Sequence, residues 1–117
     1  MNATVDILDD SEPKTGINWI TVGEILEDAG ISWKVYMEMD NFDDNGFAWF
    51  EQYRKALPGN PLFDKGMVRH LNVSKTFTED FKNGDLPQVS FLINPAWLSE
   101  HAGYHPADGE EQSSKFI

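Results

Sequence analysis

Apolar and polar positions along the first third of the chain follow two different periods. Thr21 and Glu24 form a capping-box pattern, apolar residues follow on one side, and Gly30 suits a helix end. This spacing predicts a helix over 21–29. Residues 31–37 (ISWKVYM) alternate instead and are rich in β-formers, which predicts a strand. The order helix, glycine, strand is typical of an α/β repeat.

The middle of the chain predicts two more helices. Residues 47–57 (FAWFEQYRKAL) place aromatic side chains at helical spacing, and we interpret this stripe as core packing rather than as the wall of a ligand site. Proline and glycine at 58–61 end this helix, and residues 62–73 are predicted to form a loop. Thr76 and Glu79 form a second capping-box pattern, which predicts a helix over 76–83.

The last third of the chain repeats the α/β order. Residues 89–93 are almost entirely apolar, which predicts a strand buried on both faces. A polar loop follows, and Asp108 is the predicted N-cap of a final helix that runs to Ile117. We expect Phe116 and Ile117 to lack a packing partner. Two strands and four short helices are few for an α/β sheet, so we also expect an internal fragment of a longer protein.

Charge and composition narrow the possible functions. The net charge of −11 argues against binding nucleic acid through bulk electrostatics, and the lack of cysteine excludes thiol catalysis and thiolate metal sites. No apolar run reaches the roughly 20 residues of a membrane span. Residues 1–18 are predicted to be a linker or loop without a signal-peptide pattern, and residues 19–117 a single domain.

The acidic turn at 38–46 invites comparison with a calcium-binding loop. With Gly46 at the invariant glycine, Asn41, Asp43 and Asn45 fall at the first, third and fifth ligand positions. The twelfth position is then Gln52, where a bidentate glutamate is needed. The pattern therefore favours a polar turn before a helix, although a calcium-binding interaction module stays open as an alternative.

Candidate chemistry gathers in the loop that follows the last predicted strand. The loop carries Glu100, His101, His105 and Asp108, and strand ends are where α/β enzymes commonly place active sites. Gly103 and Pro106 make a helical His101–His105 zinc pair doubtful. A triad with Ser99 cannot be recognised from spacing along a loop. An imidazole at this place could bind a phosphate oxygen or could simply hydrogen-bond the loop backbone.

The same stretch, LPQVSFLINPAWLSEHAGYHPADG, resembles a segment of the bacterial phospholipase C family that runs LPQVSW, SEHP and PADG. Upstream, AGISWKVY, DNFDDN, AWF and PGNPLFDKGM are similar to the phosphocholine-specific branch of that family. The resemblance covers the chain from about Trp19 to its end, with the motifs in the same order. It implies an α/β fold, here part of a three-layer α/β/α sandwich similar to alkaline phosphatase, with residues 19–117 a fragment of the phosphoesterase catalytic domain.

The resemblance implies hydrolysis of the phosphodiester of phosphatidylcholine to diacylglycerol and phosphocholine. An acid phosphatase of the same family is the alternative, and a non-enzymatic acidic module is a second one. It also implies a secreted or periplasmic enzyme that meets a membrane surface transiently, with a choline phospholipid as substrate and no stable protein partner. Trp49, Trp97 and Tyr104 are possible walls for the choline cation.

The resemblance assigns roles residue by residue. His101 is the catalytic and phosphate-binding histidine of the SEH motif, although Ala102 replaces the usual proline. Glu100, in the same motif, is the second catalytic candidate, and His105 and Asp108 are candidates for substrate binding. The hydroxyl nucleophile and the DENDG-type acidic motif are not in this chain. We therefore expect no metal or cofactor bound by these residues, a divalent metal as possible in the intact enzyme, and no activity from this chain alone.

Overall fold

The computed structural model describes residues 17–42 and 44–117. The predicted linker therefore lies almost entirely outside the described residues, as does Asp43. The elements in chain order are the helix α1 (Val22–Asp28), the strand β1 (Trp33–Tyr36), the 3₁₀ helix η2 (Gly46–Trp49), the helices α2 (Glu51–Arg54), α3 (Pro61–Gly66) and α4 (Val73–Asn83), the strand β2 (Val89–Leu92), the 3₁₀ helix η3 (Ala96–Leu98) and the helix α5 (Pro106–Ser114).

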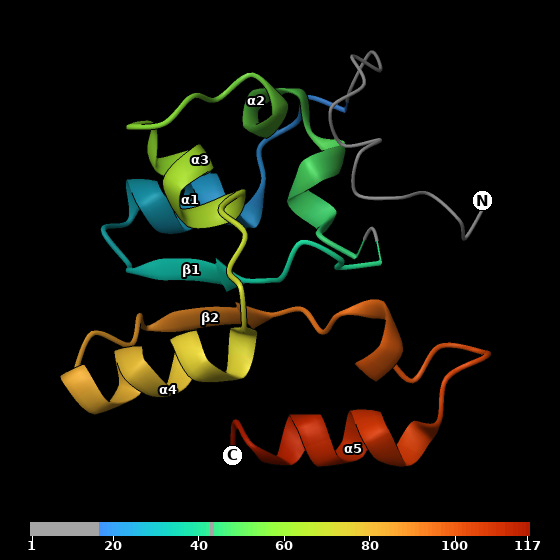
Figure 1. Cartoon of the computed structure of the whole chain (residues 1–117). Coiled ribbons are helices and arrows are strands. Elements are labelled where there is room, and N and C mark those ends of the chain that lie inside the picture. The colour runs from blue at the N-terminus through green and yellow to red at the C-terminus, as the bar shows by residue number, and fades with distance from the viewer. Residues whose placement is uncertain (1–16, 43) are drawn as a thin grey trace.

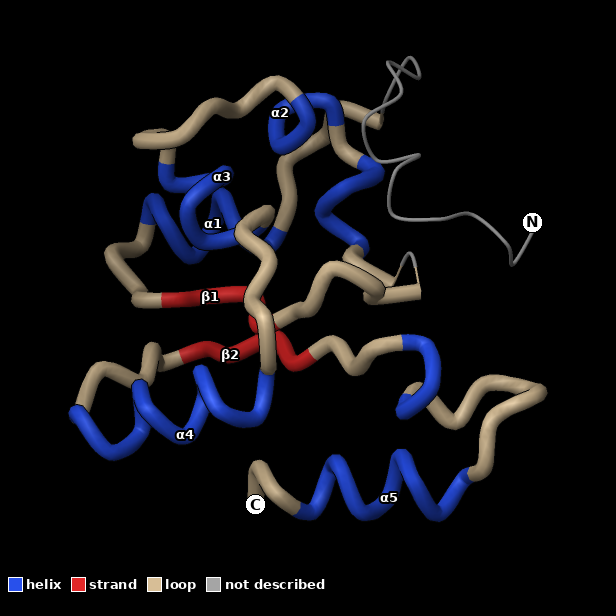
Figure 2. The backbone as a smooth tube through the Cα atoms, in the orientation of Figure 1, coloured by secondary structure: helices blue, strands red, loops and turns tan. Residues whose placement is uncertain are grey.

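β1 and β2 form a two-stranded parallel sheet, which confirms both predicted strands and the mixed α/β class. The register runs from Trp33 opposite Val89 to Tyr36 opposite Leu92. Helices lie on both sides of the strands, with α1 and α3 on one side and α4 and α5 on the other (Figure 1; Figure 2). Because the strands are parallel, the loops that follow them start at the same side of the sheet, where the carboxyl ends of both strands lie. This side is the carboxyl edge of the sheet.

The main core lies on the side of α1 and α3. Trp33, Val35 and Met37 point into it from β1 and its end, and they meet the buried rings of Phe47 and Tyr53. The Phe47 and Tyr53 rings stack with centroids 4.8 Å apart, and Trp33 tilts against Phe47 at 5.5 Å. In the predicted aromatic stripe, Phe47 and Tyr53 are therefore core residues and Phe50 packs against them, as the sequence indicated, whereas Trp49 is 37% exposed.

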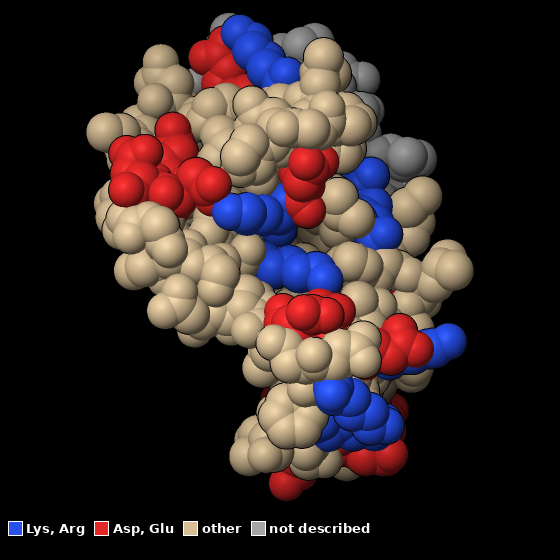
Figure 3. All heavy atoms as spheres, turned by 90° about the vertical axis from the view of Figure 1, so that its left-hand side faces the viewer, with Lys and Arg blue, Asp and Glu red and all other residues tan. Residues whose placement is uncertain are grey.

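The opposite side of the sheet carries a polar cluster against α4. Asp80 of α4 accepts hydrogen bonds from Lys34 Nζ at 2.6 Å and from the Tyr36 hydroxyl at 2.7 Å. The Tyr36 ring also packs on Phe77 of α4, with centroids 5.3 Å apart. On the face of the molecule seen in Figure 3, Lys and Arg side chains lie beside Asp and Glu side chains.

The first predicted helix is confirmed. Thr21 caps α1, and the Glu24 carboxylate accepts from the Thr21 backbone N–H at 2.8 Å, so the capping box is complete. Gly30 follows with φ 68°, which suits glycine. The Thr21 hydroxyl also lies 2.8 Å from the Tyr53 hydroxyl, which ties the start of the helix to the core.

Two helix predictions were wrong in their bounds because tertiary contacts intervene. The stretch predicted as one helix is divided at Phe50, whose extended backbone forms a bridge with Ile17. Residues 62–73 are not all loop, because α3 begins within the predicted terminator. Asn60 caps it through its side chain, and Pro61 occupies the first helical position.

The starts of the last two helices also differ from the prediction. α4 begins three residues early, because Asn72 accepts from the Lys75 N–H at 2.7 Å and replaces Thr76 as the cap. α5 is capped by His105, three residues before the predicted cap Asp108.

Two packing expectations were also wrong. Leu92 of β2 is 39% exposed, since β2 pairs with one strand in the described part of the chain. Phe116 does have a partner, because its ring meets Phe77 edge-on at 5.2 Å, whereas Ile117 is fully exposed, as expected.

Among the described residues, no helix is both long enough and apolar enough to cross a membrane.

Replacing Gly23 by alanine should destabilise the fold by about 1–3 kcal/mol, because the new Cβ would collide with the Tyr53 hydroxyl and lie 3.1 Å from Trp33. The urea midpoint of the purified protein measures this effect. Gly46→Ala is the matched control, since its Cβ would meet no atom within 4 Å. Equal midpoints for the two variants would contradict the close packing at Gly23.

Candidate functional site

The candidate site lies at the carboxyl edge of the sheet, where residues 37–45 and 93–105 leave the two strands. The rings of Phe42 and His101, one from each loop, have centroids 4.5 Å apart at an interplanar angle of 49°. The parallel sheet therefore joins two of the sequence motifs, DNFDDN and SEH, in one place. Carboxyl ends of parallel strands are the usual position of binding sites in α/β proteins.

His101 is exposed and is oriented by its own loop. Its backbone N–H donates to the Ser99 hydroxyl at 3.3 Å, and its Nδ1 lies 3.1 Å from the Ala102 carbonyl oxygen. A carbonyl can only accept, so Nδ1 carries the hydrogen in this arrangement. Nε2 is then the acceptor atom of the neutral ring. The geometry leaves this atom for a ligand.

Glu100 has an unusual backbone conformation, and its side chain packs closely against α5. Its φ is 61°, the left-handed region that non-glycine residues seldom adopt. Its side chain lies against Gly109 of α5, where an added Cβ would collide with the Glu100 Cγ. Strain of this kind is often found where a structure holds functional groups. Glu100 therefore anchors the histidine loop on α5.

His105 and Asp108 lie apart from the His101 ring contact. His105 caps α5, and its Nδ1 accepts from the Ala107 N–H at 3.2 Å. Asp108 is exposed in the first turn of α5. In the described part of the chain, no hydrogen bond links the His101 ring to the Ser99 hydroxyl or to Asp108. The two weaker alternatives, a zinc pair and a triad, gain no support from this geometry.

The described amide side chains of the turn compared with a calcium-binding loop have other partners. Asn45 accepts from the Phe47 N–H at 3.2 Å and donates to the Gly66 carbonyl at 2.9 Å. Asn41 is fully buried and donates to the Met37 sulfur, and Gln52 donates to the Trp19 carbonyl. These amides fasten the turn to the protein. In residues 17–42 and 44–117, no group of three or more possible metal ligands is present.

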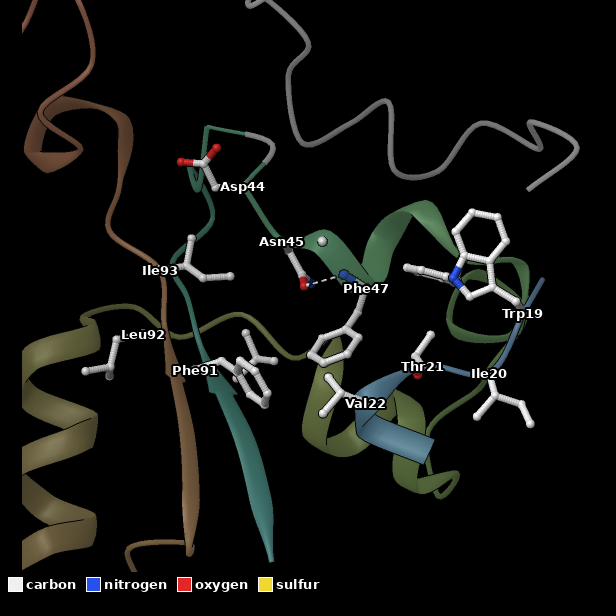
Figure 4. A pocket seen from close by; sticks show the side chains of 13 residues that line it. Trp19, Ile20, Thr21, Val22, Asp44, Asn45, Phe47, Phe91, Leu92 and Ile93 are labelled. Atoms are coloured by element: carbon white, nitrogen blue, oxygen red, sulfur yellow. Dashed lines mark hydrogen bonds between the residues drawn. The ribbon is translucent and has the colours of Figure 1, made fainter. Parts of the chain in front are cut away.

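An apolar cavity of about 470 Å³ opens beside this edge of the sheet. Figure 4 shows Trp19 and Ile20 on one wall and Leu92 and Ile93 on the other. Asp44 lies at its rim, in the same loop as Phe42. The lining suits hydrocarbon better than a phosphate group.

A second cavity, of about 410 Å³, is acidic and lies between α4, η3 and α5. It is lined by Glu38, Asp108 and Glu111 together with Trp97 and Lys115, and the Lys115 Nζ lies 3.6 Å from the Glu111 Oε1. Trp97 is 57% exposed, so part of its indole surface is open to solvent. Carboxylates beside an indole face form a setting that favours an organic cation.

Beside the polar cluster on β1 lies a partly buried histidine, His70, whose ring centroid is 6.0 Å from that of Tyr36. Burial lowers the pKa of His70, and nearby Lys34 lowers it further, against the opposite influence of Asp80. The His70 Nε2 has no hydrogen-bond partner. Burial raises the pKa of Asp80, but the hydrogen bonds from Lys34 and Tyr36 outweigh it, so the net shift is downward. Burial and Asp80 together raise the pKa of Tyr36.

Two residues at this edge were missed from the sequence. Phe42 is part of the DNFDDN motif, to which the resemblance assigns no individual site residue and whose comparison with a calcium loop involves only its oxygen ligands. Asn94, directly after β2, donates to the Leu98 carbonyl at 3.2 Å, and its buried Oδ1 has no hydrogen-bond partner. No periodicity marks either residue: Phe42 gains its place from the contact with a distant loop, and Asn94 from a hydrogen bond within its own loop.

The chain belongs to the Phosphoesterase family, whose model matches residues 2–117. Among its relatives is a non-hemolytic phospholipase C of Burkholderia pseudomallei, 37% identical in an alignment of 115 positions that covers 78% of this chain. A non-hemolytic phospholipase C of Pseudomonas aeruginosa is 43% identical over 102 positions, covering 85% of the chain. A hemolytic phospholipase C of the same organism is 27% identical.

These relatives confirm the resemblance to the phospholipase C family that the motifs indicated. The chain spans 16% and 14% of the lengths of the two non-hemolytic relatives. It is therefore similar to one segment of enzymes that hydrolyse phosphoric diesters.

The partly buried His70 predicts a stability that depends on pH. Its folded pKa lies below the ordinary 6.5, so the unfolded state binds a proton first as the pH falls. The stabilisation is complete above about pH 6.5 and is lost progressively below it. The urea midpoint of the purified protein should therefore fall from pH 7 to 5, and His70→Gln should flatten this slope. An unchanged slope in the variant would contradict the assignment.

Proposed function

We propose that this chain is part of a phospholipase C that hydrolyses the phosphodiester of phosphatidylcholine to diacylglycerol and phosphocholine. One observation carries the proposal: the SEH-motif histidine, His101, lies at the carboxyl edge of a parallel sheet in a member of the Phosphoesterase family. The names of the relatives support the reaction class, and the non-hemolytic name supports a choline phospholipid.

In this proposal, His101 binds the phosphoryl group. Its Nδ1 is held by the Ala102 carbonyl, so the protonated ring offers Nε2–H to a phosphoryl oxygen. The same hydrogen bond strengthens as negative charge develops during displacement at phosphorus. The attacking hydroxyl belongs to another part of the enzyme, since the family's nucleophile motif is not among these residues. A divalent metal, if the enzyme uses one, would be held there as well.

The fold supports this arrangement. Core residues of β1 face α1 and α3, whereas Lys34 and Tyr36 face α4 on the opposite side. We propose that this small sheet is part of a three-layer α/β/α sandwich similar to alkaline phosphatase. The exposed Leu92 of β2 fits a sheet that continues beyond the two strands described.

The acidic cavity would receive the choline cation. Asp108, Glu38 and Glu111 provide negative charge, and the partly exposed Trp97 provides an indole face. Quaternary ammonium groups bind to such combinations by cation–π attraction. This gives Asp108 its predicted place in substrate binding. The enzyme would act outside the cytoplasm at a lipid surface, as the resemblance implies.

Replacing His101 by alanine should lower turnover at least about 100-fold, because a charge-stabilising donor to the phosphoryl group is lost. The measurement is hydrolysis of p-nitrophenylphosphorylcholine by the natural polypeptide that contains these 117 residues, with circular dichroism to show that the fold is kept. Turnover at the wild-type level would disprove the role of His101.

His105→Asn is the matched control, since asparagine can still cap α5. We expect its turnover to stay within about twofold of wild type. A loss as large as that of the alanine variant would place His105 in the phosphate site too. Comparing p-nitrophenylphosphorylcholine with p-nitrophenyl phosphate separates a diesterase from the acid phosphatase alternative.

Replacing Gly109 by alanine should lower turnover about 10-fold, because the new Cβ displaces Glu100 and with it the histidine loop. Alanine favours a helix over glycine by about 1 kcal/mol, so α5 itself should not be lost. Ser113→Ala on the exposed side of the same helix is the control. Equal turnover for both variants would show that the packing of Glu100 against Gly109 is not needed for the reaction.

A further inference from the structure

Among residues 17–42 and 44–117, the aromatic ring that packs on His101 is that of Phe42, which belongs to the loop after the other strand. The two centroids are 4.5 Å apart, and the rings are inclined by 49°. Phe42 is partly buried, whereas His101 is exposed. One face of the imidazole is therefore covered by a phenyl ring, and its Nε2 edge is left for a ligand.

The protein holds Phe42 in a conformation that a bulky residue seldom adopts. Its φ is 53°, in the left-handed region, and its N–H donates to the Asp40 carboxylate at 3.3 Å. The neighbouring Asn41 is fully buried and donates to the sulfur of Met37, directly after β1. The turn is thus fastened at the end of the strand. Such backbone strain persists only where contacts with the surrounding structure hold the residue in that conformation.

The histidine side of the contact is held in a similar way. Glu100 is left-handed with φ 61°, and its side chain is seated on Gly109. The Ala102 carbonyl meets Nδ1 of the His101 ring at 3.1 Å. A ring held at one nitrogen can still swing about that hydrogen bond, and an aromatic neighbour on one face limits this movement.

We propose that Phe42 is a positioning residue, which packs on the imidazole of His101 and fixes the direction of Nε2 toward the phosphoryl group. This inference rests on the proposed function of His101. It assigns to the DNFDDN turn a role in the reaction in place of the calcium site considered from its oxygen ligands. Phe42 itself does not touch the reacting atoms.

The proposal predicts a loss that depends on the ring and acts through His101. Phe42→Leu should lower kcat about 10-fold and change KM less than about twofold, because a misdirected group impairs the reaction more than binding. Phe42→Tyr keeps the ring and should retain most of the turnover. Phe81→Leu, the same change at an exposed position of α4, is the matched control and should behave as wild type.

A double-mutant cycle separates this role from general packing. In the His101→Ala background, Phe42→Leu should cause no further loss, since nothing remains to be positioned. A loss that is equal in both backgrounds, or wild-type kcat in Phe42→Leu, would overturn the inference. Unchanged turnover in His101→Ala alone would instead mean that the proposed function fails.

Nuclear magnetic resonance gives a readout that does not depend on activity. In the natural polypeptide labelled with ¹³C-histidine, the His101 ring protons should be displaced by the Phe42 ring current. The signals are assigned by their loss in His101→Gln. They should move toward the values of a solvated histidine in Phe42→Leu and stay displaced in Phe42→Tyr. Identical His101 signals in wild type and Phe42→Leu would overturn the contact itself.

Discussion

Parallel pairing of β1 with β2 is the constraint on which the candidate site depends. Four residue pairs, from Trp33 and Val89 to Tyr36 and Leu92, set the register. Because both strands run in the same direction, the loop with Phe42 and the loop with His101 leave from one edge. The two motifs are far apart in the sequence, and the pairing of the strands is what brings them together.

The two faces of this sheet serve different purposes. One face is an aromatic core, in which Trp33 and Tyr53 pack so closely with Gly23 that the glycine cannot carry a Cβ without a collision. The other face carries a partly buried ion pair, in which Asp80 accepts hydrogen bonds from Lys34 and the Tyr36 hydroxyl. A buried polar cluster is favourable only when its members are paired. The core thus fixes the strands, and the polar face fixes α4 on them.

Local sequence signals predicted the helices and strands correctly where a helix cap or a clear hydrophobic pattern was present. The capping box at Thr21, the alternation in 31–37 and the apolar run from Val89 all led to the observed elements. The predictions failed where the chain had a stronger partner elsewhere. Phe50 becomes extended because it bridges to Ile17, and Phe116 finds a partner in Phe77 of α4. No local pattern contains those partners.

The sequence by itself determined the family and the α/β class and singled out His101 as a candidate, because motifs and periodicity are properties of neighbouring residues. The tertiary structure decided the surroundings of that histidine. In the folded chain, His105 caps a helix, the Glu100 side chain packs against Gly109, and the Phe42 ring packs on the imidazole of His101. These contacts arise from the parallel sheet and from two left-handed residues, at Phe42 and Glu100, that neither propensity nor spacing would predict. Their physical origin is packing between segments that are distant along the chain.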